Sequence, residues 1–222
     1  MTIATLDRST GRTPATSVGT RAAPVSAGTS TNGTAGLVGL CFLVATFTFA
    51  IGNALIRPSL SSATAHRGSM AGALLLGFGG VAVAVNGVAM RRKLLPSTPL
   101  RSRAYSALRG AECLTLLAVA VSLITGHRQW NGYVLAVYAV SGAAGLVLSS
   151  ALLTSKIVPR NLSLLGLVGY PIFLAGTALA VWHVIGVTHG VGMLALVPGG
   201  LFELILPIWL FTKGFGSHEI AT

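Results

Sequence analysis

Three charged side chains lie inside long apolar segments of this sequence: Arg109, Glu112 and Glu203. A charge at the centre of a membrane helix costs on the order of 2.5 to 3.5 kcal/mol on insertion scales, so each one needs a partner or water. Arg109 and Glu112 are three residues apart, which places them about one turn apart on one helical face. These two side chains are therefore predicted to be close enough to pair.

Glu203 lies near the middle of the last apolar segment, ten residues before Lys213. That separation is roughly 15 Å along a helix, so no cation of the same helix can reach the carboxylate. Pro207 follows four residues later and has no N–H, which leaves the main-chain carbonyl of Glu203 without its helical partner. A loosened turn of this kind is typical of transporter helices that break around a binding site.

Together these residues predict an intramembrane polar cluster. We place Arg109 near the start of its segment, from where its long side chain can point inward to meet Glu112, Glu203 or both. Asn53 and Asn86 are expected to extend the polar interior, although a lone asparagine is more typical of contacts between helices. Two functions remain open: binding and transport of a small ligand or a proton, or an ion pair that only holds helices together.

Other side chains give weaker signals. No H-E-x-x-H motif occurs, and Ser141 lacks the preceding glycine pattern of a serine hydrolase, with His183 near the outer end of its segment. The histidines toward the outer face have no zinc-site spacing, and both cysteines fall in apolar segments as packing residues. The sequence thus favours a protein that is not an enzyme, with no catalytic residue, metal site or cofactor. The outer histidines and the cysteines are His66, His127, His183, His189, Cys41 and Cys113.

The composition indicates which kind of fold carries this polar cluster. Of 222 residues, 53% are hydrophobic and only 9% are charged, against about 25% charged in an ordinary globular domain. Apolar runs of about 20 residues are long enough to cross the hydrocarbon of a bilayer. We therefore predict an all-α, polytopic membrane helix bundle with six transmembrane helices. The expected spans are residues 35–56, 71–90, 105–125, 133–153, 162–185 and 191–212.

The third span is the least obvious, because Arg109 and Glu112 interrupt it. Only residues 113–125 are continuously uncharged, and 13 residues are too few to cross a bilayer. The first span also admits a second interpretation, since Ala63-Thr64-Ala65 resembles a signal-peptide cleavage site. Its apolar run exceeds the usual length of such a signal, which favours a retained helix.

Basic residues outside the spans predict the orientation. Eleven of the 15 Lys and Arg residues fall in the first tail, in alternate connections (91–103 and 156–160) and at Lys213, against three on the other side. Because cytoplasmic loops hold the excess of positive charge, a multi-pass protein of the cell membrane with both termini in the cytoplasm is expected. The net charge of +11 is therefore interpreted as topology and as contact with anionic lipid headgroups, not as nucleic-acid binding. The oligomeric state stays open.

Three regions follow from these patterns. Residues 1–34 include 22 that are Ser, Thr, Gly or Ala and show no helical periodicity, so they are expected to form a disordered cytoplasmic tail. Residues 35–215 form the transmembrane domain, and residues 216–222 form a short second cytoplasmic tail. Glycines are frequent in the second span, which predicts close helix packing.

Three stretches also carry a family resemblance. They are Arg109-Gly110-Ala111-Glu112, the segment 155–163 that follows the fourth span, and Leu201-Phe202-Glu203-Leu204, which opens a run to Phe215. In this order and spacing, over residues 35–215, the chain resembles the bacterial membrane family called domain of unknown function 4386. Asn161 departs from the aromatic residue expected there. The resemblance implies the six-helix plan and adds no mechanism.

Two classes of function remain. In the first, Arg109, Glu112 and Glu203 form a partly wet site for transport, with proton binding at Glu203 as the simplest coupling step. Each three-helix half then carries a carboxylate in its third helix, as an inverted repeat would, although the halves show no sequence similarity. In the second, the protein is a non-catalytic accessory or scaffold. A polar path to Glu203 would favour the first function, and a dry, fully paired Arg–Glu contact the second.

Overall fold

The computed structural model describes residues 29–59, 66–125, 130–186 and 190–216. Every regular element in these ranges is an α-helix, and all six helices are long and apolar enough to cross a membrane. The predicted all-α bundle of six spans is confirmed. The helices are α1 (Thr29–Ser59), α2 (His66–Leu94), α3 (Pro99–Ile124), α4 (Trp130–Ser155), α5 (Arg160–Val181) and α6 (Gly190–Lys213).

The helix ends differ by one to six residues from the expected bounds, and three of these differences change how a segment is interpreted. α1 begins at Thr29, so the last six residues assigned to the disordered tail are helical, and residues 1–28 lie outside the described part of the chain. α3 begins at Pro99 and not at residue 105, because proline is pre-organised for the first helical position. α5 ends at Val181, short of residue 185, since His183 adopts a left-handed backbone (φ 58°) that an α-helix cannot continue.

The early start of α3 changes the segment 91–103, which was expected to be a loop. Only residues 95–98 join α2 to α3. Arg91, Arg92 and Lys93 form the last turn of α2, where positive charge complements the helix dipole. The basic residues of this segment are thus held on two helix ends at one end of the bundle.

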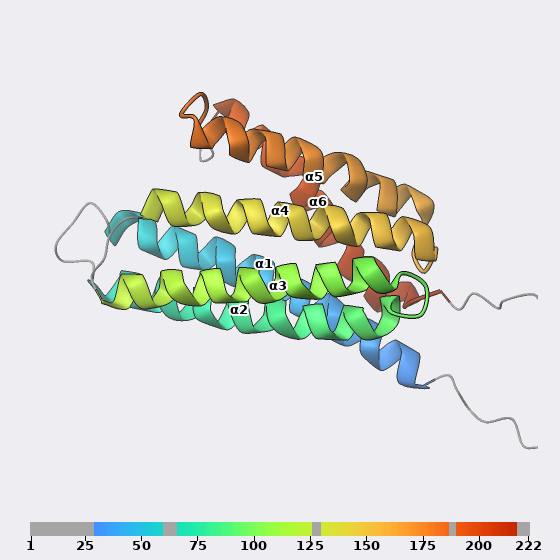
Figure 1. Cartoon of the computed structure of the whole chain (residues 1–222). Coiled ribbons are helices and arrows are strands. Elements are labelled where there is room, and N and C mark those ends of the chain that lie inside the picture. Colours follow the sequence, from blue (N-terminus) through green and yellow to red (C-terminus); the bar gives the residue numbers. More distant parts are fainter. Residues whose placement is uncertain (1–28, 60–65, 126–129, 187–189, 217–222) are drawn as a thin grey trace, which may run out of the picture.

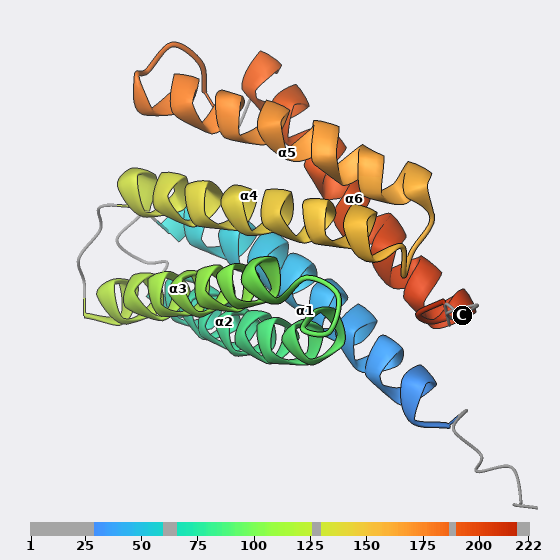
Figure 2. The ribbon, with the colours of Figure 1, turned by 45° about the vertical axis from the view of Figure 1, so that its right-hand side comes forward.

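The six helices pack as a closed series. α1 to α3 contact one another in chain order, as do α4 to α6, and the contacts α3 with α4 and α1 with α6 join the two groups. Both views show the start of α1, the α2–α3 and α4–α5 connections and the end of α6 at the same end of the bundle (Figures 1 and 2). We refer to this end as the basic end, because the segments 91–103 and 156–160 and Lys213 lie there.

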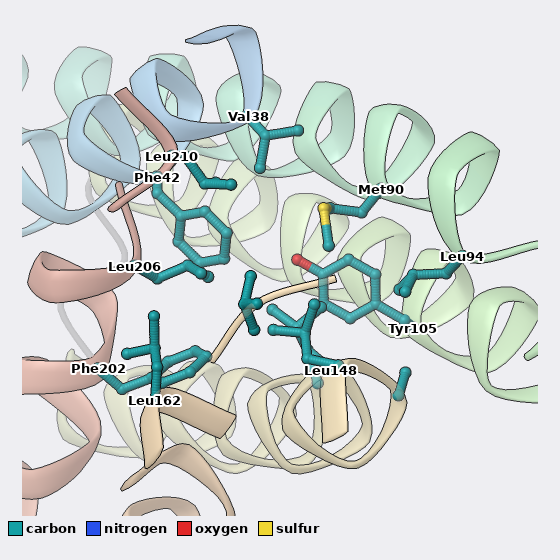
Figure 3. Close-up of a cluster of buried hydrophobic side chains, with 14 of the residues drawn as sticks. Val38, Phe42, Met90, Leu94, Tyr105, Leu148, Leu162, Phe202, Leu206 and Leu210 are labelled. Carbon is teal, nitrogen blue, oxygen red and sulfur yellow. The ribbon is translucent and has the colours of Figure 1, made fainter. Parts of the chain in front are cut away.

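Two buried clusters divide the interior. The first draws on all six helices and includes Phe42, Tyr105, Leu148, Leu162 and Phe202 (Figure 3). The second draws on α1 to α4 alone and lies toward the opposite end. The bundle is therefore packed across its full width toward the basic end, whereas α5 and α6 contribute no described residue to the second cluster.

The outer surface of the bundle is apolar. Large hydrophobic side chains on the described helices are strongly exposed, among them Leu74, Phe78, Leu114, Val168 and Leu194. In water such a surface would be unstable, but it suits contact with lipid tails. The chain is a multi-pass membrane protein whose helices contact the bilayer.

Candidate functional site: a polar cavity inside the bundle

Arg109 and Glu112 form a buried ion pair on α3. Nη1 of Arg109 donates to Oε2 of Glu112 at 2.7 Å, and the two residues are only 3% and 5% exposed. α3 begins at Pro99, so Arg109 lies ten residues, or roughly 15 Å, inside the helix and not near its start as the sequence suggested. The pair therefore lies close to the middle of the span.

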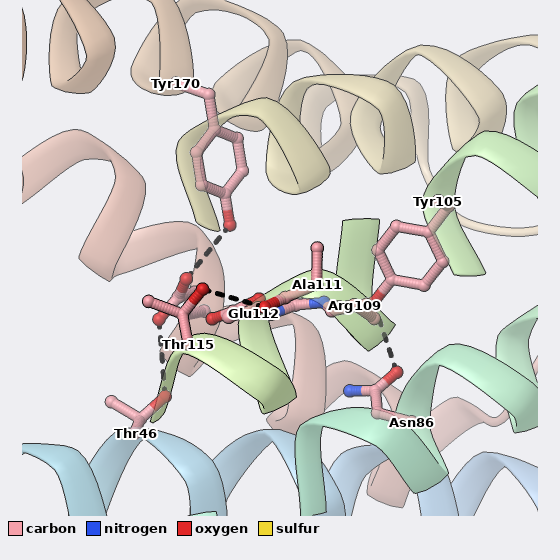
Figure 4. Close-up of polar contacts among 9 residues, drawn as sticks. Thr46, Asn86, Tyr105, Arg109, Ala111, Glu112, Thr115 and Tyr170 are labelled. Carbon is pink, nitrogen blue, oxygen red and sulfur yellow. Dashed lines mark hydrogen bonds and ion pairs between the residues drawn. The ribbon is translucent and has the colours of Figure 1, made fainter. Parts of the chain in front are cut away.

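A chain of hydrogen bonds fixes the guanidinium from its other side. Nε of Arg109 donates to the phenol oxygen of Tyr105 at 2.9 Å, and that phenol donates to Oδ1 of Asn86 at 3.2 Å (Figure 4). The guanidinium carbon lies 5.3 Å from the ring centres of both Phe42 and Tyr105, within cation–π range. Arg109 is thus held by a carboxylate, a phenol and two aromatic rings.

A glycine on α2 makes this arrangement possible. A Cβ added to Gly87 would lie 2.7 Å from Cβ of Arg109, closer than two carbons can approach. The missing side chain lets α2 and α3 come together at this point, which brings the neighbouring Asn86 within reach of Tyr105.

Glu203 on α6 has a different environment. Its carboxylate accepts hydrogen bonds from the phenol of Tyr170 on α5 (3.2 Å) and from the hydroxyl of Thr46 on α1 (3.3 Å), marked by dashed lines in Figure 4. Within the described ranges no ion pair reaches it, because Arg109 pairs with Glu112. The side chain is partly exposed. Glu203 therefore has two neutral donors and an open side.

The position of Tyr170 depends on packing between α4 and α5. A side chain on Gly145 would collide with the Tyr170 ring, so this glycine provides the space that the ring occupies. The ring also packs edge-on against Phe202, with centroids 5.6 Å apart, and against Phe173 at 6.4 Å. The phenol oxygen is therefore aimed at Glu203 by rigid contacts.

Proline residues flank both partners of this hydrogen bond. Pro171 follows Tyr170 inside α5, and Pro198 and Pro207 lie on either side of Glu203 inside α6. Each proline removes a main-chain hydrogen bond from the helix interior, which makes that turn easier to bend. Pro207 was expected from the sequence to loosen α6 near Glu203, and Pro171 and Pro198 are two further prolines inside the helices that carry Tyr170 and Glu203.

Both carboxylates border one cavity of about 360 Å³ in the interior of the bundle, to which all six helices contribute. Arg109, Glu112, Glu203 and Asn86 line it, whereas Asn53 is partly exposed on α1 and is not among its lining residues. Four of the five residues of the predicted polar cluster are thus brought together. The other lining residues are Phe42, Ala45, Thr46, Phe49, Ala50, Val83, Leu116, Val137, Tyr138, Ser141, Phe173 and Leu196.

The charges around this cavity do not balance. Among its lining residues in the described chain, Arg109 is the single cation and Glu112 and Glu203 are two anions. Arg109 attracts both carboxylates, but one positive charge cannot neutralise two negative ones. With all three groups ionised, the cavity carries one excess negative charge in a medium of low dielectric constant.

The site contains residues that the sequence analysis did not identify. Tyr105 lies four residues before Arg109, and this helical spacing was a usable signal. Tyr170 and Thr46 come from helices remote in the sequence, and nothing local connects them to Glu203. Their role follows only from how α1, α5 and α6 pack.

Among the remaining candidates that the structure describes, Ser141 alone lines the cavity. His183 is exposed just after α5, His66 begins α2, and His127 and His189 lie outside the described residues. In the described part, no group of three metal-ligating residues comes together. Ser141 lines the cavity without a histidine among its lining residues, and Cys41 and Cys113 are free thiols.

The fold and the site define a class: a polytopic α-helical membrane protein with a charged cavity between its helices. Residues 115–214 match the family described as Domain of unknown function (DUF4386), which confirms the resemblance seen in the sequence over just under half of the chain. The matched segment contains Tyr170 and Glu203 and begins after Arg109 and Glu112. No curated protein and no solved structure matches the chain.

Proposed function

We propose that this protein is a carrier that moves a small ligand across the membrane, with proton binding at Glu203 as the coupling step. One observation carries the proposal: Glu203 borders a cavity formed by all six helices and has only neutral hydrogen-bond donors. An intramembrane carboxylate without a cation has to be neutralised by a proton or by a ligand. A carboxylate that binds either a proton or the ligand, but not both, couples the transport of the ligand to the movement of protons.

The arrangement of the helices supports alternating access. The cavity lies between the group α1–α3 and the group α4–α6, with Glu112 and Glu203 each on the third helix of its group, as an inverted repeat would place them. Pro171, Pro198 and Pro207 give α5 and α6 turns that bend near Glu203. Bending there would change which end of the cavity is closed.

We further propose that the basic end faces the cytoplasm and that both termini lie there, in the cell membrane. The basic residues that the structure groups at this end support this orientation. Lys156 and Arg160 also border a surface cleft of about 480 Å³ at the α4–α5 connection, which suits anionic lipid headgroups. Since the core is continuous at the basic end, this conformation would be closed toward the cytoplasm.

Thiol labelling tests the proposal without knowledge of the ligand. In a background with Cys41→Ala and Cys113→Ala, Ser141→Cys places a thiol at the cavity wall. A small, charged, impermeant thiol reagent should modify it in intact cells. The matched control is Leu114→Cys, whose position is 69% exposed on the lipid-facing surface and should stay unmodified. Failure to label Ser141→Cys from either side of the membrane would contradict a water-filled cavity.

An accessory or scaffold role is the second candidate, and one observation favours it. Arg109 is fully engaged by Glu112, Tyr105 and Phe42 inside the bundle, as expected of a contact that serves assembly alone. This candidate explains the α3 side of the cavity but gives no reason for the open side of Glu203. An inaccessible, water-free cavity would favour this accessory role over the carrier.

A further inference from the structure

The excess negative charge of the cavity is located at Glu203. Glu112 receives a direct ion pair at 2.7 Å, whereas Glu203 receives hydroxyl groups at 3.2 and 3.3 Å. Two hydroxyl donors stabilise a carboxylate but leave its charge uncompensated. A ligand that binds beside Glu203 is therefore favoured if it carries one positive charge.

Aromatic rings border the same space. Phe49 of α1, Tyr138 of α4 and Phe173 of α5 all line the cavity. They form a continuous series, with ring centroids 5.7 Å apart for Phe49 and Tyr138 and 5.5 Å apart for Tyr138 and Phe173. The faces of aromatic rings attract cations, and their bulk favours an apolar ligand body.

We propose that the cavity binds a small organic monocation: a quaternary ammonium or a protonated amine with an apolar substituent. The positive nitrogen lies against Glu203, and the apolar part lies against Phe49, Tyr138 and Phe173. This inference rests on the proposed carrier function and names the ligand class for the same site. The cavity volume of about 360 Å³ is within the range of pockets that hold small organic ligands.

Other ligand classes fit the cavity less well. An anion would meet two carboxylates, and Arg109, the one cation among the described lining residues, is already held by Glu112, Tyr105 and Phe42. A metal ion is usually held by several His, Cys, Asp or Glu side chains, but the described residues bring no group of three of these together. A neutral apolar molecule would leave the charge of Glu203 without a partner.

A proton and the organic cation should compete for Glu203. The groups that face this carboxylate are Thr46 from α1, Tyr170 from α5, and Arg109 and Glu112 among the cavity-lining residues of α3. A protonated Glu203 has no net charge and no longer attracts a cation. Binding of a permanently charged ligand should therefore weaken as the pH falls, which is the exchange that a proton-coupled carrier requires.

Equilibrium dialysis of the purified full-length protein with labelled benzyltrimethylammonium tests the inference. This ion cannot lose its charge, and its neutral carbon analogue, neopentylbenzene, serves as the uncharged competitor. We expect saturable binding that Glu203→Gln weakens by about tenfold or more and Phe173→Leu by roughly three- to tenfold. Phe78→Leu, at a position 61% exposed to lipid, is the matched control and should bind like the unchanged protein.

The outcomes separate the inference from the function on which it rests. If Ser141→Cys is labelled but benzyltrimethylammonium does not bind, the ligand class is wrong and the carrier proposal stands. Equal binding by the unchanged protein and by a folded Glu203→Gln variant would also overturn the inference, as would equally strong competition by neopentylbenzene. If Ser141→Cys is inaccessible and the ion does not bind, both proposals fail. Elution volume and thermal stability of each variant establish that it is folded.

Discussion

Glu112 and Glu203 border the same cavity, but Glu112 contacts a cation at 2.7 Å and Glu203 contacts two hydroxyl groups at more than 3 Å. Glu112 is 5% exposed and lies in α3, which has no proline after its first residue, whereas Glu203 is partly exposed and lies between two prolines of α6. The difference indicates that a buried charge can be kept for two reasons. One carboxylate completes the packing of the bundle, and the other remains available to a mobile partner.

The largest loss of stability is expected when the Arg109–Glu112 ion pair is broken. Arg109→Leu leaves Glu112 buried without a cation and should lower the free energy of unfolding by about 3 to 5 kcal/mol. The double variant Arg109→Leu with Glu112→Leu should recover much of this loss, because an apolar pair has no desolvation cost. Denaturant titration in mixed micelles of these two variants and of the single variant Glu112→Leu yields the coupling free energy.

A second cycle tests whether the two carboxylates differ as the contacts indicate. Arg109→Leu combined with Glu203→Leu should show a smaller coupling free energy than the cycle with Glu112, because among the described residues the ion pair of Arg109 is with Glu112 and not with Glu203. A larger coupling free energy in the Glu203 cycle than in the Glu112 cycle would contradict the different roles assigned to the two carboxylates. Arg109 would then neutralise Glu203, and the cavity would lose its excess charge.

An intermediate loss of stability is expected from substitutions of the two glycines that make room for Arg109 and Tyr170, the partners of Glu112 and Glu203. Gly87→Ala places a methyl group against Arg109, and Gly145→Ala places one against Tyr170. Each should cost about 1 to 3 kcal/mol, the range for overpacking a tight interior. Gly110→Ala is the matched control, because a Cβ there has no neighbour within 4 Å and alanine favours a helix by up to about 1 kcal/mol.

The two glycine variants should also differ in their effect on the cavity. Gly145→Ala displaces the phenol that donates to Glu203, so it should weaken binding of benzyltrimethylammonium, measured by the same dialysis. Gly87→Ala acts on the ion pair and should reduce stability with a smaller effect on binding. Equal loss of binding in the two variants would show that the two sides of the cavity are not independent.

Much of this arrangement could be predicted because its signals are local. Apolar length gave the six spans, and the spacing of three residues gave the Arg109–Glu112 pair. The start of α3 was misjudged because charged residues 101 and 103 resemble a loop, although Pro99 is a good first residue of a helix. The partners of Glu203 could not be found, since Thr46 is 157 residues away in the sequence and Tyr170 is 33. Contacts of that separation depend on packing.

The smallest loss of stability is expected when the hydroxyl groups that donate to Glu203 are removed. The size of this loss depends on whether the cavity holds water. Tyr170→Phe and Thr46→Val each remove one donor while keeping most of the side-chain volume, and should each cost about 0.5 to 1.5 kcal/mol. Thr115→Val is the control for the threonine, because that exposed hydroxyl bonds only to the carbonyl of Ala111 in its own helix, at 2.8 Å. Its effect should be close to zero.

The double variant Tyr170→Phe with Thr46→Val gives the sharper result. In a wet cavity, water replaces both hydroxyl groups at the carboxylate, so the total loss should stay near the sum of two small terms. In a dry cavity the same double variant leaves a buried polar group without any donor, and the loss should exceed that sum by several kcal/mol. Unfolding in mixed micelles measures the difference. A small, additive loss together with labelling of Ser141→Cys would support Glu203 as an exchangeable site, whereas a large excess loss would give Glu203 the same structural role as Glu112.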